Sequence, residues 1–69
     1  MIKSRLKYWM EKKGITYAAL EKMTGLSSQT ITRARGELIR ECRLSTLENM
    51  AKALGVDVAD LFEFTSEGD

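Results

Sequence analysis

The chain has 69 residues, one cysteine and no histidine, and its formal net charge is +1 at pH 7. A lone thiol excludes an internal disulfide, and without histidine the sequence offers neither a Cys-His catalytic pair nor a Cys-His metal site. The apolar runs are too short for a transmembrane span, and Lys3, Arg5 and Lys7 lie inside the apolar pattern of residues 1–10, which does not fit a signal peptide. We therefore expect one cytoplasmic domain without metal or cofactor.

The first predicted helix covers residues 2–13. Its apolar side chains recur at helical spacing and form one stripe, at Ile2, Leu6, Trp9 and Met10. A glycine follows this helix and each of the next three, where a left-handed C-terminal cap is expected. These glycines are Gly14, Gly25, Gly36 and Gly55.

The second predicted helix is short and opens at Thr16, a residue type that caps helix N-termini well. Its inward side chains are expected to be Ala19, Leu20 and Met23. Residues 24–26, Thr-Gly-Leu, then break the helix sharply after barely two turns.

The third predicted helix runs from Ser28 to about Arg35 and is capped by Ser27. Helical spacing places Ile31 and Ala34 on one face, which we expect to be buried. The opposite face carries polar and basic side chains, namely Ser28, Gln29, Thr32 and Arg33. The two faces therefore have different roles.

The fourth predicted helix opens with a capping box formed by Ser45 and Glu48. It is the clearest amphipathic helix in the chain, because apolar residues recur at one face. These are Leu47, Met50, Ala51 and Leu54. The preceding segment, residues 38–44, is harder to assign, since Leu38 and Ile39 are too apolar for an exposed loop.

A fifth, short helix is predicted after Gly55, with Asp57 as its cap and Val58, Leu61 and Phe62 within it. Residues 65–69 are polar and are expected to form a frayed tail, so the domain spans residues 1–64. No alternation of apolar and polar residues predicts a strand. The elements together predict an all-α domain of five short helices.

Charge is distributed unevenly along the chain. Residues 1–43 hold ten basic and four acidic residues, a net charge of +6, whereas residues 44–69 hold one basic and six acidic residues, a net charge of −5. This asymmetry favours a polyanionic partner for the basic half. A charged surface that only faces solvent is the alternative.

Two short helices joined by a tight glycine-containing turn are typical of a helix-turn-helix, here from Tyr17 to about Gly36. Residues 16–33, TYAALEKMTGLSSQTITR, resemble the Cro/C1 repressor type of this motif, also called the Xre family. Residues 44–56, LSTLENMAKALGV, are similar to the fourth helix of that family, and residues 60–62 to its fifth. The resemblance covers residues 2–64 and implies a lambda-repressor-like fold.

The resemblance implies that the third helix reads DNA bases from its first turns. The matching positions are Ser28, Gln29, Thr32 and Arg33. Their chemistry suits the role, because Gln pairs with adenine, Arg pairs with guanine, and a Thr methyl group contacts a thymine methyl. A helix face that only contacts solvent is the alternative.

Other residues are expected to contact phosphates. The family places phosphate contacts at the positions of Tyr17, Ser27 and Thr30, and we add Arg35, Arg40 and Arg43 on charge alone. The family usually has Gln at the position of Tyr17, where a tyrosine hydroxyl either substitutes for the amide or leaves the contact unmade.

The sequence departs from the family pattern in two further places. At Glu21 the family prefers a small residue, so this carboxylate must lean outward or find a basic partner such as Arg33 or Arg35. The link from Gly36 to Ser45 is about a residue longer than usual and carries Leu38, Ile39 and Cys42, where relatives have a polar loop containing proline.

We therefore expect a DNA-binding transcriptional regulator that acts as a repressor and binds a palindromic operator as a homodimer. Apolar residues not needed by the helices would serve the dimer: Leu38, Ile39, Phe62 and Phe64. The chain lacks histidine and a Gly-rich phosphate loop, which argues against an enzyme. The alternative function is a protein-interaction module with the same fold, such as an antitoxin-like or anti-repressor partner.

Overall fold

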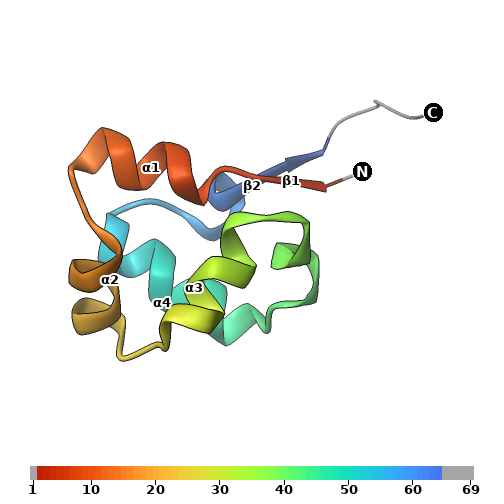
Figure 1. Ribbon diagram of the computed structural model, residues 1–69. Coiled ribbons are helices and arrows are strands. Elements are labelled where there is room, and N and C mark those ends of the chain that lie inside the picture. Colours follow the sequence, from red (N-terminus) through yellow and green to blue (C-terminus); the bar gives the residue numbers. More distant parts are fainter. Residues whose placement is uncertain (1, 65–69) are drawn as a thin grey trace.

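Four α-helices, two 3-10 helices and a two-stranded ribbon make up residues 2–64, the part of the chain that the computed structural model describes (Figure 1). In chain order the elements are β1 (Ile2–Ser4), α1 (Leu6–Lys13), α2 (Tyr17–Thr24), α3 (Ser28–Arg35), η1 (Glu37–Glu41), α4 (Leu44–Leu54), η2 (Val58–Leu61) and β2 (Phe62–Phe64). The all-α class is confirmed; four of the five predicted helices are α-helices, and the fifth is the 3-10 helix η2. The expected tail, residues 65–69, lies outside the described residues.

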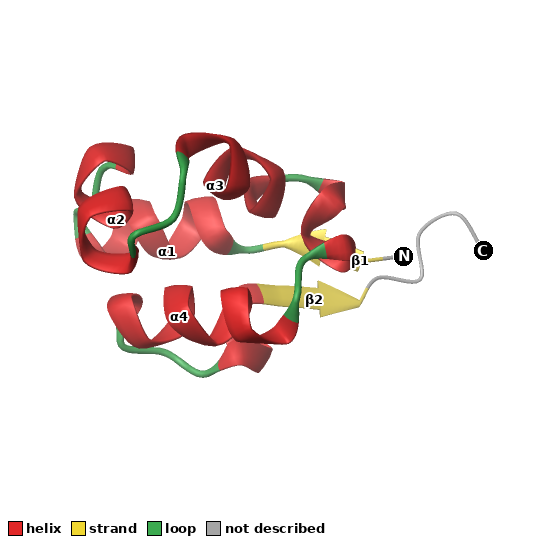
Figure 2. Ribbon diagram, turned by 90° about the horizontal axis from the view of Figure 1, so that it is seen from below, coloured by secondary structure: helices red, strands yellow, loops and turns green. Residues whose placement is uncertain are grey.

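The helices enclose a single apolar core. α2 packs against both α3 and α4, and α1 contacts the same two helices. Figure 2 shows α3 and α4 on opposite sides of the view, with α1 behind them. Every apolar residue predicted for the inner faces of α3 and α4 is buried. The core consists of Leu6, Met10, Leu20, Ile31, Ala34, Ile39, Leu47, Met50, Ala51, Leu54 and Leu61.

The two ends of the described chain pair as the antiparallel ribbon, which the sequence analysis did not predict. Ile2 lies opposite Phe64, and Ser4 lies opposite Phe62. Each strand has only three residues, which is too short for a pattern of alternation to be recognised. The backbone N–H of Arg5 continues the pairing by donating to the Leu61 carbonyl at 2.7 Å.

Helix α1 begins at Leu6 and not at residue 2, because Ser4 ends the strand and holds the start of the helix. The Ser4 hydroxyl donates to the Ala34 carbonyl at 2.5 Å and accepts from the Leu6 backbone N–H at 3.2 Å. The apolar residue Ile2, expected on the helix stripe, packs against the core from the strand instead.

The caps of α2 and α3 confirm the local predictions. The Thr16 hydroxyl accepts from the backbone N–H of Ala19 at 3.2 Å, and the Ser27 hydroxyl accepts from that of Thr30 at 3.3 Å. Gly14, Gly25 and Gly55 end their helices in the left-handed conformation. Gly36 does not, since its φ of −114° and ψ of −162° are extended, and the left-handed cap predicted there is wrong.

Helix α4 begins at Leu44, and the predicted Ser45–Glu48 capping box is wrong because Ser45 already lies inside the helix. The first turn closes on the carbonyl of Arg43, which accepts from the backbone N–H groups of Thr46 at 3.0 Å and Leu47 at 3.1 Å. No side-chain hydrogen bond caps this helix.

Both remaining segments are 3-10 turns. The predicted fifth helix is η2, where the Asp60 carboxylate accepts from the backbone N–H of Asp57 at 3.0 Å, and Phe62 belongs to β2 and not to the helix. The uncertain segment after Gly36 forms η1, in which Ile39 is buried and Leu38 is exposed. None of the described helices has the length and apolar character needed to span a membrane.

Candidate nucleic-acid interface

The turn between α2 and α3 is held by Gly25 and the side chain of Thr24. Gly25 has a φ of +75°, which reverses the chain after α2. The Thr24 hydroxyl donates to the Leu20 carbonyl at 2.6 Å and accepts from the Leu26 N–H at 3.1 Å. Leu20 and Ile31 are both fully buried, so the two helices have a fixed relative orientation.

The outward face of α3 carries the four residues predicted to read bases. Ser28, Gln29, Thr32 and Arg33 are all exposed and together line a shallow hollow of about 460 Å³. Ile31 and Ala34 hold the opposite face of the helix in the core. The structure therefore places all four side chains on one accessible surface, with hydroxyl, amide and guanidinium groups facing outward.

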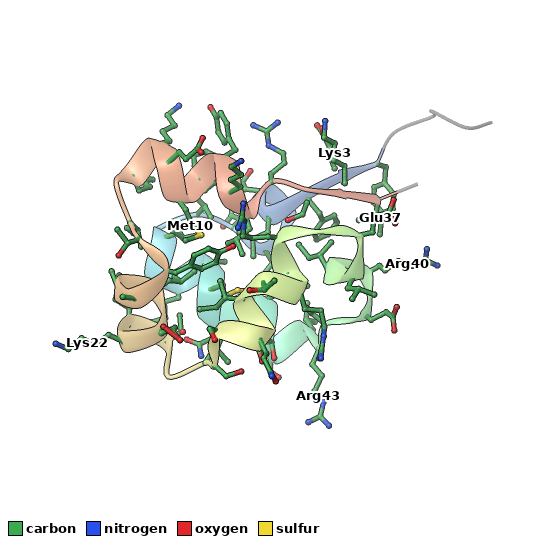
Figure 3. The ribbon with its side chains drawn as sticks, in the orientation of Figure 1. Lys3, Met10, Lys22, Glu37, Arg40 and Arg43 are labelled. Carbon is green, nitrogen blue, oxygen red and sulfur yellow. The ribbon has the colours of Figure 1, made fainter. Side chains whose placement is uncertain are left out.

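The residues predicted to contact phosphates fall into separate groups. Ser27 and Thr30 lie at the N-terminus of α3, where their hydroxyl oxygens are 3.1 Å apart. Arg40 belongs to η1, and Arg43 immediately precedes α4. Figure 3 shows these two arginines extending from the domain in different directions.

Tyr17 and Arg35 form the third group and bind each other. The Arg35 guanidinium donates to the Tyr17 hydroxyl, and its central carbon lies 4.9 Å from the centre of the Tyr17 ring. Both residues line a second hollow of about 290 Å³, bordered by Lys7 and Glu11 of α1. The four base-reading candidates do not line this second hollow.

Comparison with protein-family models gives a match to the Cro/C1-type HTH DNA-binding domain over residues 5–67. This chain belongs to that family. No curated protein matches it. Membership confirms the resemblance drawn from the sequence, and it identifies the α2–α3 unit as the helix-turn-helix of a Cro/C1-type domain.

Of the two alternatives expected for Glu21, the pairing with a basic residue is not found among the described residues. Within residues 2–64 the one ion pair joins Arg5 to Glu63, at 3.6 Å, so Glu21 pairs with neither Arg33 nor Arg35. Glu21 is half-buried, and of the two basic residues proposed as its partner, Arg35 binds Tyr17 and Arg33 is exposed on the outward face of α3.

Met23 was expected on the inner face of α2 but is 53% exposed. It lines an open groove with Asn49, Lys52 and Ala53 of α4. The Asn49 amide donates to the Thr24 carbonyl at 2.8 Å, which ties α4 to the end of α2 and leaves Met23 at the margin of the contact.

One further residue lines the hollow formed by the four base-reading candidates. Leu38 of η1 lines the same hollow as Gln29 and Arg33, and sequence reasoning assigned it to a dimer contact. The sequence feature that pointed to Leu38 is its apolar side chain in the segment between the third and fourth predicted helices. Ile39, grouped with it as a surplus apolar residue, is instead part of the core and is unavailable to a partner.

Cys42 follows η1 and is half-buried. Burial raises the pKa of its thiol above the ordinary value of 9.0, the positive charge of Arg33 opposes this, and the negative charge of Glu41 adds to it. The Cys42 thiol is therefore protonated at neutral pH.

Proposed function

We propose that this Cro/C1-type domain is a transcriptional repressor that binds operator DNA through α3 and blocks access to the promoter. The observation that carries the proposal is the exposed face of α3, where four polar side chains line one hollow on a helix anchored in the core. A helix with this exposure fits the major groove, the groove in which each base pair presents a distinct pattern of donors and acceptors.

The four residues have complementary roles in this proposal. Gln29 pairs with adenine through its amide, and Arg33 pairs with guanine through its guanidinium. The Thr32 methyl group contacts a thymine methyl, and the Ser28 hydroxyl, in the first turn of α3, bonds to a base edge. Each residue is exposed, so these contacts require no unfolding.

Contacts to DNA phosphates fix the position and orientation of the protein along the duplex. Ser27 and Thr30 are at the N-terminus of α3, where free backbone N–H groups and the helix dipole favour a phosphate. Arg40 and Arg43 are exposed cations beyond the other end of α3 and extend the contact along the backbone. Tyr17, the first residue of α2, and Arg35, the last residue of α3, contact phosphate as a hydrogen-bonded pair.

The repressor acts in the cytoplasm as a homodimer on a palindromic operator, with the two α3 helices about 34 Å apart. Phe64 supports a contact between copies, because it ends the ribbon with 75% of its surface exposed and stacks edge-to-face on Phe62. A dimer would remove this apolar surface from water.

Selection from random oligonucleotides with the purified protein tests the proposal. We expect a palindromic sequence, a footprint over both half-sites, and a dimer by sedimentation. Affinity should fall steeply with salt, because each phosphate contact releases counterions. Failure to enrich any sequence would refute operator binding, and a monomer with a single half-site footprint would refute the dimer alone.

A protein-interaction role is the second candidate, and the exposed Met23 beside Lys52 is the feature that favours it. An accessible methionine on a groove is suited to a protein surface. DNA binding that is absent or insensitive to salt would favour this candidate, and Met23→Glu would then abolish binding to the protein partner.

A further inference from the structure

We propose that Leu38 reads the C5-methyl group of a thymine in the operator, as a fifth residue of the base-reading face. This inference rests on the proposed function and extends it to a residue outside the helix-turn-helix. The observation that carries it is the shared hollow, which Leu38 lines together with Ser28, Gln29, Thr32 and Arg33.

The backbone after α3 determines where Leu38 points. Gly36 is extended, and its carbonyl accepts from the Ile39 N–H at 3.1 Å, so η1 folds back against α3. Side chains in a 3-10 helix diverge by about 120° from one residue to the next. Ile39 is 2% exposed in the core, and Leu38 is therefore directed outward, with 48% of its surface exposed.

Leu38 is not part of the buried core or of the apolar residues packed against it. Its neighbour Ile39 fills the core, whereas Leu38 presents apolar surface to solvent beside polar side chains. The major groove offers one apolar group to such a surface, the thymine C5-methyl. The residue lies at the edge of the hollow and not in the ribbon, so it belongs to the DNA face rather than to a contact through Phe64.

Deoxyuridine tests this contact, because it differs from thymidine only by the missing methyl group. Each thymine of the selected operator is replaced in turn, and affinity is measured for the wild type, Leu38→Ala and Leu44→Ala. Leu44 is the matched control, an exposed leucine at the start of α4 that does not line the hollow.

We expect one thymine per half-site at which deoxyuridine weakens wild-type binding about fourfold, the effect of losing one buried methyl group. Leu38→Ala should weaken binding to the unmodified operator by at least as much and should be insensitive to deoxyuridine at that position. Its salt dependence should match the wild type, because no charge is removed. Leu44→Ala should behave as the wild type throughout.

The inference is overturned if Leu38→Ala binds the operator as tightly as the wild type, or if it keeps full sensitivity to every deoxyuridine. A loss on all sequences together with dissociation of the dimer would assign Leu38 to a contact between copies and also overturn it. Leu38→Asn, which keeps the branched shape and the number of side-chain heavy atoms but is polar, provides a second variant if Leu38→Ala does not fold. Absence of any DNA binding by the wild type would instead refute the proposed function itself.

Discussion

Arg35, the last residue of α3, donates a hydrogen bond to the hydroxyl group of Tyr17, the first residue of α2. The guanidinium also lies over the tyrosine ring, 4.9 Å from its centre. The contact joins the outer ends of the two helices, whereas the Gly25 turn joins their inner ends. The tyrosine that departs from the family pattern is thus part of a second link within the helix-turn-helix.

The first prediction is that Tyr17→Phe and Arg35→Ala are energetically coupled. Each substitution should lower the free energy of unfolding, and the double variant should lose about 1 kcal/mol less than the sum, because the hydrogen bond can be removed only once. Urea unfolding followed by fluorescence of Trp9, the one tryptophan in the chain, measures the coupling.

Tyr8→Phe is the matched control for this prediction. The Tyr8 hydroxyl accepts from the Lys12 ammonium at 3.3 Å on an exposed surface, so its loss should change stability by less than about 0.5 kcal/mol. Strictly additive effects of Tyr17→Phe and Arg35→Ala would mean that the contact does not stabilise the fold.

The second prediction contrasts two glycines at helix ends. Gly25→Ala should destabilise the domain by about 1–2 kcal/mol, because its φ of +75° is strained for a residue with a Cβ. Gly36→Ala should be neutral or stabilise by up to about 1 kcal/mol, because its backbone is extended and alanine restricts the unfolded chain. An added Cβ meets nothing within 4 Å at either site, so only the backbone distinguishes them.

Urea midpoints of the two glycine variants measure this contrast, provided that the dependence of unfolding free energy on urea is unchanged. Equal destabilisation by both substitutions would contradict the extended conformation at Gly36. It would also undermine the orientation of η1, which depends on that conformation.

The third prediction concerns the Cys42 thiol, whose pKa burial raises above 9.0. The Cys42 thiolate attacks iodoacetamide and displaces iodide, whereas the protonated thiol does not react, so alkylation at pH 8 should be slower in the folded protein than in urea, and its rate should keep rising above pH 9. The folded state favours the protonated thiol. The contribution of Cys42 to the free energy of unfolding is therefore fully present below the pKa that the thiol has in the unfolded chain, and it is lost as pH rises through the pKa that the thiol has in the folded protein. Equal alkylation rates in the two states, with Cys42→Ser as the unreactive control, would contradict the burial.

Features that depend on a few neighbouring residues were predictable from the sequence. Thr16 and Ser27 cap their helices as expected, because a hydroxyl one position before a helix reaches the N–H three residues on. Ile31 and Ala34 are buried as their spacing predicts, which also placed Gln29 and Arg33 on the exposed face.

Features that depend on distant partners were not predictable. The ribbon requires Ile2 to meet Phe64 from the far end of the chain, and neither strand carries a recognisable signal. The position of Leu38 depends on the burial of Ile39 and on the extended conformation of Gly36. Residue type alone does not predict that conformation, because Gly25 also follows a helix but is left-handed. Local sequence therefore placed the polar face of α3 correctly, whereas the position of η1 beside it depends on tertiary packing.

The fourth prediction separates base contacts from phosphate contacts on α3. Arg33→Ala and Gln29→Ala should each weaken binding to the selected operator by about 1–3 kcal/mol and relax the preference at one base pair, a different pair for each. Lys52→Ala, which removes an exposed cation from α4, is the control and should leave the preference at every base pair unchanged. Competition with operators that each differ at one base pair measures these preferences. If Arg33→Ala instead weakens binding equally on every sequence and flattens the salt dependence by about one unit, then Arg33 contacts a phosphate and the guanine contact is wrong.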